Sequence, residues 1–199
     1  YTTSLDEWQK NELLTTNTVL RNMWIYPYRA IYQSNTILKA LENPNKNLSK
    51  PVVEEALGVA KFFRALSYLN LVTLYGDVPL VVTTDVTQTN SQPRVAKRVV
   101  FDHLIRDLQE ARQHLKGVKR SNVYITEAAV VALTARAHLY QDNWKEALNA
   151  ANELVDGELK GLLQLEDISN VFQRSSKETI FAISTTGSNP QVVNHNFVG

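Results

Sequence analysis

Apolar residues recur every three or four positions through most of this chain, which predicts a mainly α-helical protein. The pattern is weak over 4–16, the first helical segment, and strong over 22–41, the second. Pro27 lies inside the second stripe, so that helix either starts around 22–26 or bends at Pro27. Ser49 and Pro51 suit the first turn of a third helix that runs to about Leu74. The second half of that helix is apolar nearly all round, so we expect it to lie at the centre of the fold.

A patternless stretch separates this helix from the next one. Residues 82–96 are rich in Thr, Asn and Gln and predict an irregular insertion. Beyond it, apolar spacing predicts helices over 101–115, 127–139 and 144–155. Near the C-terminus, Thr179–Ser184 contains β-forming residues and predicts one short strand.

The last two predicted helices form a pair with small residues at the contact positions. A turn of a few residues joins them, and Asn143 and Glu146 have the spacing of a capping box at the start of the second helix. The pattern resembles a tetratricopeptide repeat at Ala135, Trp144, Ala147, Ala151 and Leu154. We therefore predict a mainly α fold: a tetratricopeptide-like helix-pair layer, a long irregular insertion after the third helix, and a short strand near the C-terminus.

The insertion begins at the sequence YGDVPLV, residues 75–81. Gly76 is expected to take a left-handed conformation that ends the helix, and Asp77 is expected to bond nearby backbone amides in the turn. Pro79 prevents the helix from continuing and favours an extended Val78. We interpret the stretch as a structural corner, which need not contact a ligand.

Composition limits the classes of function. At 199 residues, the chain is long enough for one domain with a real core or at most two small ones, and we treat 1–199 as a single domain. The formal net charge of +1 gives no electrostatic reason to expect nucleic acid or an anionic membrane as a partner. The chain has no cysteine, which excludes disulfides, thiolate catalysis and cysteine-based zinc sites. It opens at Tyr1 instead of Met, so we expect its N-terminus to have been processed or cut.

The sequence favours a protein without catalytic or metal chemistry. The histidines show no metal-binding spacing, and neither a phosphate-binding glycine loop nor a nucleophile elbow is present. Pairs of carboxylates are read as solvated helix faces, so we expect no enzyme, no metal site and no cofactor. Arg64 is the exception, because a charge in an apolar helix needs a partner. We predict that it pairs with Asp107 of the neighbouring helix; the alternative is that it extends to solvent.

Five ordered stretches resemble the SusD/RagB family of Bacteroidetes surface lipoproteins. The most specific is FFRALSYLNLVTLYGDVPLV at 62–81, which is similar to the family's helix ending in Tyr-Gly-Asp-aliphatic-Pro-Leu. WIYPYRAIYQSNTIL, PRVAKRVVFDHLIRDLQEARQHL, AAVVALTARAHLYQDNWKEALNAANELV and SKETIFAIS agree in order with four further family segments. The resemblance covers roughly residues 22–184.

The resemblance implies a non-enzymatic protein lipid-anchored at the outside of the outer membrane. Such a protein would bind a nutrient, usually an oligosaccharide, and deliver it to a SusC-like TonB-dependent transporter. Family members are more than twice as long, so we expect the later ligand-binding region and the anchor to be missing from this chain. An alternative reading is a tetratricopeptide-like protein–protein interaction scaffold without its own glycan site. A third is an α-helical glycoside hydrolase.

Aromatic residues are the natural candidates for sugar contacts, since their faces pack on the apolar side of a pyranose ring. Trp8 lies in a weakly patterned segment among polar residues that include Asn11, and Tyr124 precedes a helix. These three are our candidate substrate-binding residues, although Trp8 also suits a role as an anchor of the first helix. The remaining aromatics have core spacing and are predicted to pack: Trp24, Tyr28, Tyr32, Phe62, Phe63, Tyr140 and Trp144.

Overall fold

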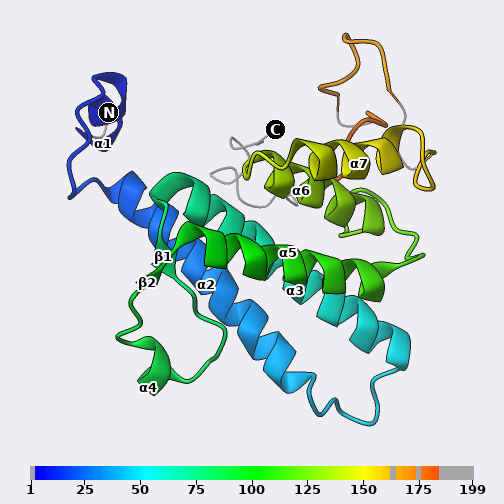
Figure 1. The fold of residues 1–199 in the computed structure, drawn as a ribbon, viewed down its shortest axis with the longest axis horizontal. Coiled ribbons are helices and arrows are strands. Elements are labelled where there is room, and N and C mark those ends of the chain that lie inside the picture. Colours follow the sequence, from blue (N-terminus) through cyan, green and yellow to red (C-terminus); the bar gives the residue numbers. More distant parts are fainter. Residues whose placement is uncertain (1–2, 162–164, 174–175, 184–199) are drawn as a thin grey trace, which may run out of the picture. The chain divides into compact units, whose positions relative to one another are not determined.

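The computed structural model describes residues 3–161, 165–173 and 176–183 (Figure 1). The predicted mainly α fold is confirmed in this part of the chain. Its elements are α1 (Thr3–Gln9), α2 (Thr18–Ala40), α3 (Lys50–Tyr75), β1 (Val78–Pro79), α4 (Val86–Thr89), β2 (Arg94–Val95), α5 (Lys97–Leu115), α6 (Glu127–Leu139) and α7 (Trp144–Val155).

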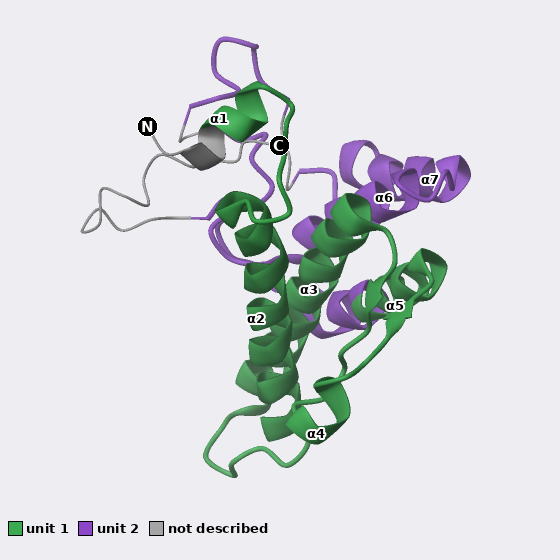
Figure 2. Cartoon of the chain, turned by 90° about the vertical axis from the view of Figure 1, so that its left-hand side faces the viewer, with its two compact units in different colours: residues 1–107 green, residues 108–199 purple. Residues whose placement is uncertain are grey.

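The chain divides into two compact units, 1–107 and 108–199, with the boundary inside α5 (Figure 2). The prediction that the whole chain behaves as a single domain stays a prediction. No helix in the described part is both long and apolar enough to span a bilayer.

Helices α2 and α3 form the main body of the first unit. The side chain of Asn17 begins α2 by accepting hydrogen bonds from the backbone amides of Val19 and Leu20, at 2.9 and 3.1 Å. The helix begins at Thr18 and runs through Pro27, so of the two alternatives a start around 22–26 is wrong. The predicted position of α3 in the core is confirmed, because its second half is buried at Phe62, Ala65, Tyr68, Leu69, Leu71 and Val72.

The insertion between α3 and α5 has more structure than its sequence indicates. Strands β1 and β2 pair antiparallel, with Val78 opposite Val95 and Pro79 opposite Arg94. Proline is tolerated here because a two-stranded ribbon leaves one edge of each strand unpaired. This pairing holds the two ends of the insertion together, and the short helix α4 lies between them.

In the second unit, α6 and α7 pack as a pair, as predicted. Small and aliphatic residues form the core of the pair: Ala128 and Val131 of α6, Ala150 and Leu154 of α7, and Leu159, which follows α7. Arg112 of α5 adds charged bonds to both helices, to Glu127 Oε1 at 3.1 Å and to Glu153 Oε2 at 2.6 Å.

Two local predictions in this unit were wrong. Residues 179–183 of the predicted strand Thr179–Ser184 form no strand, and Ser184 lies outside the described residues. The Ala182 amide instead makes one backbone hydrogen bond, to the Asn122 carbonyl at 2.8 Å, and a single bond is not a ladder. The capping box also fails, since the side chain of Asn143 makes no cap hydrogen bond within α7.

Candidate functional site

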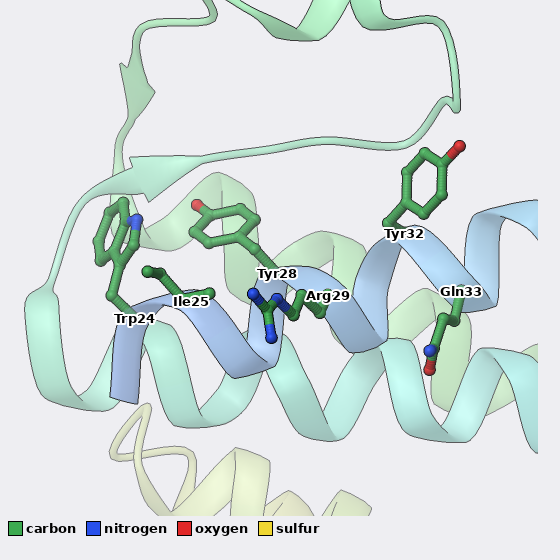
Figure 3. Close-up of a pocket in the computed structure, with 6 residues that line it drawn as sticks. All are labelled: Trp24, Ile25, Tyr28, Arg29, Tyr32 and Gln33. Carbon is green, nitrogen blue, oxygen red and sulfur yellow. The ribbon is translucent and has the colours of Figure 1, made fainter. Parts of the chain in front are cut away.

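A shallow groove of about 430 Å³ runs along one side of α2 (Figure 3). Three aromatic residues, Trp24, Tyr28 and Tyr32, follow one another at intervals of four along this helix. Four residues advance an α-helix by about 6 Å and slightly more than one turn, so the three rings form a row. The groove is completed by Ile25, Arg29 and Gln33.

Two of the aromatic rings are fixed by the protein itself. Trp24 meets Tyr75 edge to face, with ring centroids 5.0 Å apart, and the Arg94 guanidinium lies 5.2 Å from its ring centre. The Tyr28 hydroxyl donates a hydrogen bond to the Pro79 carbonyl at 2.8 Å. Burial raises the pKa of Tyr28, so the hydroxyl stays protonated and keeps donating. The predicted packing role is confirmed for these two residues.

The other end of the row is open. Tyr32 is 51% exposed, and Arg29 and Gln33 are also exposed. The prediction that Tyr32 packs in the core was therefore wrong, as it was for Tyr140 and Trp144, which are 51% and 61% exposed. Helical spacing places these side chains on a common face but does not supply a neighbour to cover it.

Residues 75–79, the corner, contact the end of the groove formed by Trp24 and Tyr28. Tyr75 packs on Trp24, and the Pro79 carbonyl accepts a hydrogen bond from the Tyr28 hydroxyl. Gly76 has φ 69° and ψ −121°. The positive φ is one that few other residues adopt, but the expected left-handed helical conformation was wrong, because that conformation needs a ψ of about +47°. We expected the Asp77 carboxylate to bond the amides of its own turn, and this prediction was wrong. The carboxylate accepts the backbone N–H of Lys97, the first residue of α5, at 2.8 Å, where a negative charge complements the positive helix end.

A buried polar network joins α2, α3 and α5. The Arg64 guanidinium donates two hydrogen bonds to the Asp107 carboxylate, both at 2.7 Å. The two residues are only 7% and 3% exposed, so the predicted pair is confirmed and the alternative of a solvent-reaching Arg64 is wrong. Burial would raise the pKa of Asp107, but the hydrogen bonds from Arg64, together with the His103 imidazole 3.4 Å away, hold it below its ordinary value.

The same network reaches the insertion. Arg64 donates a third bond to Asn35 of α2 at 2.7 Å, and the Asn35 amide donates to the Val81 carbonyl at 3.1 Å. The Tyr68 hydroxyl accepts the Val81 N–H at 2.6 Å. The chain following Pro79 is thus tied to side chains of α2 and α3, which holds it beside the aromatic row.

The three candidate residues from the sequence fall in different places. Trp8 is 36% exposed in α1, and the backbone amide of Asn11 bonds its carbonyl at 3.3 Å. These two therefore belong to one turn of the first unit. Tyr124 belongs to the second unit, where it is 53% exposed with the Arg120 guanidinium 5.5 Å from its ring centre. Their part in binding stays a prediction.

The described residues contain no cluster of three or more histidines and acids arranged to hold a metal ion. The groove instead has side chains that can bind an uncharged or anionic ring: the aromatic face of Tyr32, the amide of Gln33 and the guanidinium of Arg29. Such a set stacks on a ring and donates hydrogen bonds to oxygen atoms. Sequence reasoning missed these three residues, and the one available signal was the four-residue spacing of the aromatic row.

The fold and the groove define a mainly helical protein with tetratricopeptide-like pairs and an open aromatic surface. Residues 1–139 match the family model for SusD-like proteins, described as starch-binding and associating with the outer membrane. Because that match covers more than half of the sequence, the chain belongs to the SusD-like family.

Individual relatives agree with this assignment. SusD-like protein P2 of Formosa agariphila is 26% identical over 180 residues, which cover 86% of this chain and 35% of the relative. The chain therefore spans about a third of the length of that curated relative.

Solved structures share the fold. A SusD superfamily protein of Bacteroides thetaiotaomicron superposes with a TM-score of 0.82 at 23% identity, covering 93% of this chain and 43% of the other. A SusD-like carbohydrate-binding protein of Bacteroides fragilis superposes with a TM-score of 0.75 at 20% identity, covering 86% and 34%.

Proposed function

We propose that this chain is part of a non-catalytic carbohydrate-binding protein of the cell surface, lipid-anchored in the outer membrane. It binds an oligosaccharide and delivers it to a TonB-dependent transporter. The observation that carries the proposal is the open aromatic groove on α2, in a chain of the SusD-like family. The carbohydrate-binding description of the Bacteroides fragilis relative supports the same reading.

The groove suits a sugar ring in a specific way. The exposed face of Tyr32 packs on the apolar face of a pyranose, while Gln33 and Arg29 donate hydrogen bonds to its oxygen atoms. Trp24 and Tyr28 are held in place by other parts of the protein, so they extend the apolar surface without losing side-chain freedom on binding. Trp8, Asn11 and Tyr124 are proposed as additional contacts outside the groove.

A glycan array followed by calorimetry tests the binding proposal. We expect at least one oligosaccharide to bind, and Tyr32→Ala to weaken it about tenfold, which corresponds to about 1.4 kcal/mol. Tyr140→Ala is the matched control, because Tyr140 has the same exposed fraction, 51%, and lies in the second unit. Equal losses in the two variants would contradict a site at the groove. Release of reducing sugar during the assay would contradict the non-catalytic proposal.

Delivery to a transporter needs a separate test with the full-length protein. We expect a TonB-dependent transporter to co-purify with it from solubilised outer membranes. Recovery of the protein from those membranes without any transporter would contradict the delivery step and leave the binding proposal standing.

One observation favours the alternative of a protein-interaction scaffold. Trp144 and Leu148 lie one turn apart on α7 and are 61% and 59% exposed, and neighbouring exposed apolar side chains can mark a protein-interaction surface. If the chain is only a scaffold, Trp144→Ala will abolish co-purification of a partner while no oligosaccharide binds. If it is a receptor, Tyr32→Ala will affect sugar binding and Trp144→Ala will not.

A further inference from the structure

The groove lies on a helix whose charges are all positive. Helix α2 contains Arg21, Arg29 and Lys39, and the whole stretch 13–41 has neither Asp nor Glu. Arg29 is the one charged residue among the six that line the groove. A ligand in the groove therefore meets a cation and no lining carboxylate.

The Arg29 guanidinium has no acidic partner within the part of the chain that the structure describes. The guanidinium makes a cation–π contact with Tyr26, whose ring centre lies 5.5 Å away. A guanidinium held on an aromatic face has a defined position, and its N–H groups stay available to a carboxylate or sulfate. Arg64 differs in being buried against Asp107.

Arg29 also lies close to Tyr32, the residue on which a sugar ring is proposed to stack. Arg29 and Tyr32 are three positions apart on α2, and such residues are neighbours on a helix surface with about 5–6 Å between their Cβ atoms. Gln33 follows Arg29 by four positions and lies on the same side. A ring stacked on Tyr32 would therefore place its substituents near both donors.

We propose that the groove selects acidic oligosaccharides, in which a carboxylate or sulfate lies next to the ring that stacks on Tyr32. This inference rests on the proposed function, to which it adds the class of ligand. Arg29 is the specificity-determining residue. Guanidinium–carboxylate and guanidinium–sulfate bonds are charge-assisted, so the anion strengthens binding about tenfold over the neutral analogue.

Matched pairs of oligosaccharides test the inference by calorimetry in low salt. The probes are galacturonan and alginate oligosaccharides against their fully methyl-esterified forms, and dextran sulfate oligosaccharides against dextran. We expect the acidic member of at least one pair to bind about tenfold more tightly. The uronate pairs and the sulfate pair separate the two kinds of anion.

Two variants separate recognition by Arg29 from general attraction to a basic surface. Arg29→Gln should reduce the acidic preference to within twofold, and Arg29→Lys should restore part of it. Arg98→Gln removes the same charge from α5, where the Arg98 side chain is 89% exposed, and should leave the preference intact. Circular dichroism confirms that each variant is folded.

Three results would overturn the inference. Equal affinities within every pair would show that the groove does not distinguish acidic from neutral sugars. Equal losses of the acidic preference in Arg29→Gln and Arg98→Gln would show unspecific electrostatic attraction. If either of these two results appears while Tyr32→Ala still weakens sugar binding, the proposed function survives and only the acidic preference fails. If no oligosaccharide binds, acidic or neutral, both fail.

Discussion

The Arg64–Asp107 pair gives the most direct test of what the buried polar network contributes to stability. Asp107→Ala removes two hydrogen bonds of 2.7 Å and leaves the guanidinium of a residue that is 7% exposed with only Asn35 as its hydrogen-bond partner in the described network. Breaking a buried ion pair in this way costs about 3–5 kcal/mol. That is a large part of the roughly 5–15 kcal/mol that stabilises an ordinary domain.

Arg64→Ala should cost less. The Asp107 carboxylate keeps Lys61 Nζ at 4.0 Å and the polar His103 Nε2 at 3.4 Å, so it is not left without a positive neighbour. The double variant Arg64→Ala with Asp107→Ala removes both charges, so it leaves neither one buried without a partner, and it should lose less than the sum of the single losses. We expect a coupling energy of about 2 kcal/mol or more.

Urea unfolding followed by circular dichroism measures the free energy of unfolding of the four proteins in this double-mutant cycle. The exposed pair Arg98–Asp102, with side chains 89% and 58% exposed, is the control, and its coupling should be about 0.3–0.5 kcal/mol. A coupling for Arg64–Asp107 no larger than that of the control would refute the reasoning.

The pair also makes the stability of the folded protein depend on pH in the acidic range. Because the pKa of Asp107 is lowered in the folded state, its stabilising effect is present above the ordinary value of about 3.9 and is lost as the pH falls through the folded value. Asp107→Ala should therefore flatten the loss of stability below about pH 4. An unchanged acid profile would contradict this assignment.

Three further outcomes follow from local features. Gly76→Ala should cost about 1–3 kcal/mol in urea unfolding, because φ is 69° while no atom lies within 4 Å of the added Cβ; an unchanged midpoint would exclude backbone strain. Asp77→Ala should cost about 1 kcal/mol through the lost bond to Lys97, and Asp77→Asn should recover much of it; equal effects would contradict an acceptor role. Burial lowers the pKa of His138, so stability should fall as the pH drops below about 6.5; a His138→Gln variant with the same slope would refute that cause.

Sequence reasoning succeeded where a physical requirement leaves few solutions. Arg64 lies in an apolar helix, so its charge needed either a buried acid or a path to solvent, and Asp107 of the neighbouring helix was the expected acid. The positive φ at Gly76 was predictable because a long helix ends there and Pro79 follows. Asn35 was not predictable as the third member of the network, since a neutral amide on α2 carries no comparable requirement.

The failures share a dependence on contacts between distant segments. Asp77 bonds Lys97 because β1 and β2 pair, and strands of two residues leave no periodic signal in the sequence. Tyr32 has the spacing of a core residue, but its exposure depends on which segments cover that side of α2. The region 179–184 has β propensity, which becomes a strand only when a partner strand is available.

The most direct test of the carbohydrate proposal is a crystal structure of the protein with the tightest-binding oligosaccharide from the array. We expect a sugar ring stacked on Tyr32, with hydrogen bonds from Gln33 and from Arg29. A sugar bound at Trp8 or Tyr124, with the α2 groove empty, would contradict the proposed site while keeping the binding function. Absence of bound sugar at every concentration, from a protein shown to be folded, would contradict the function itself.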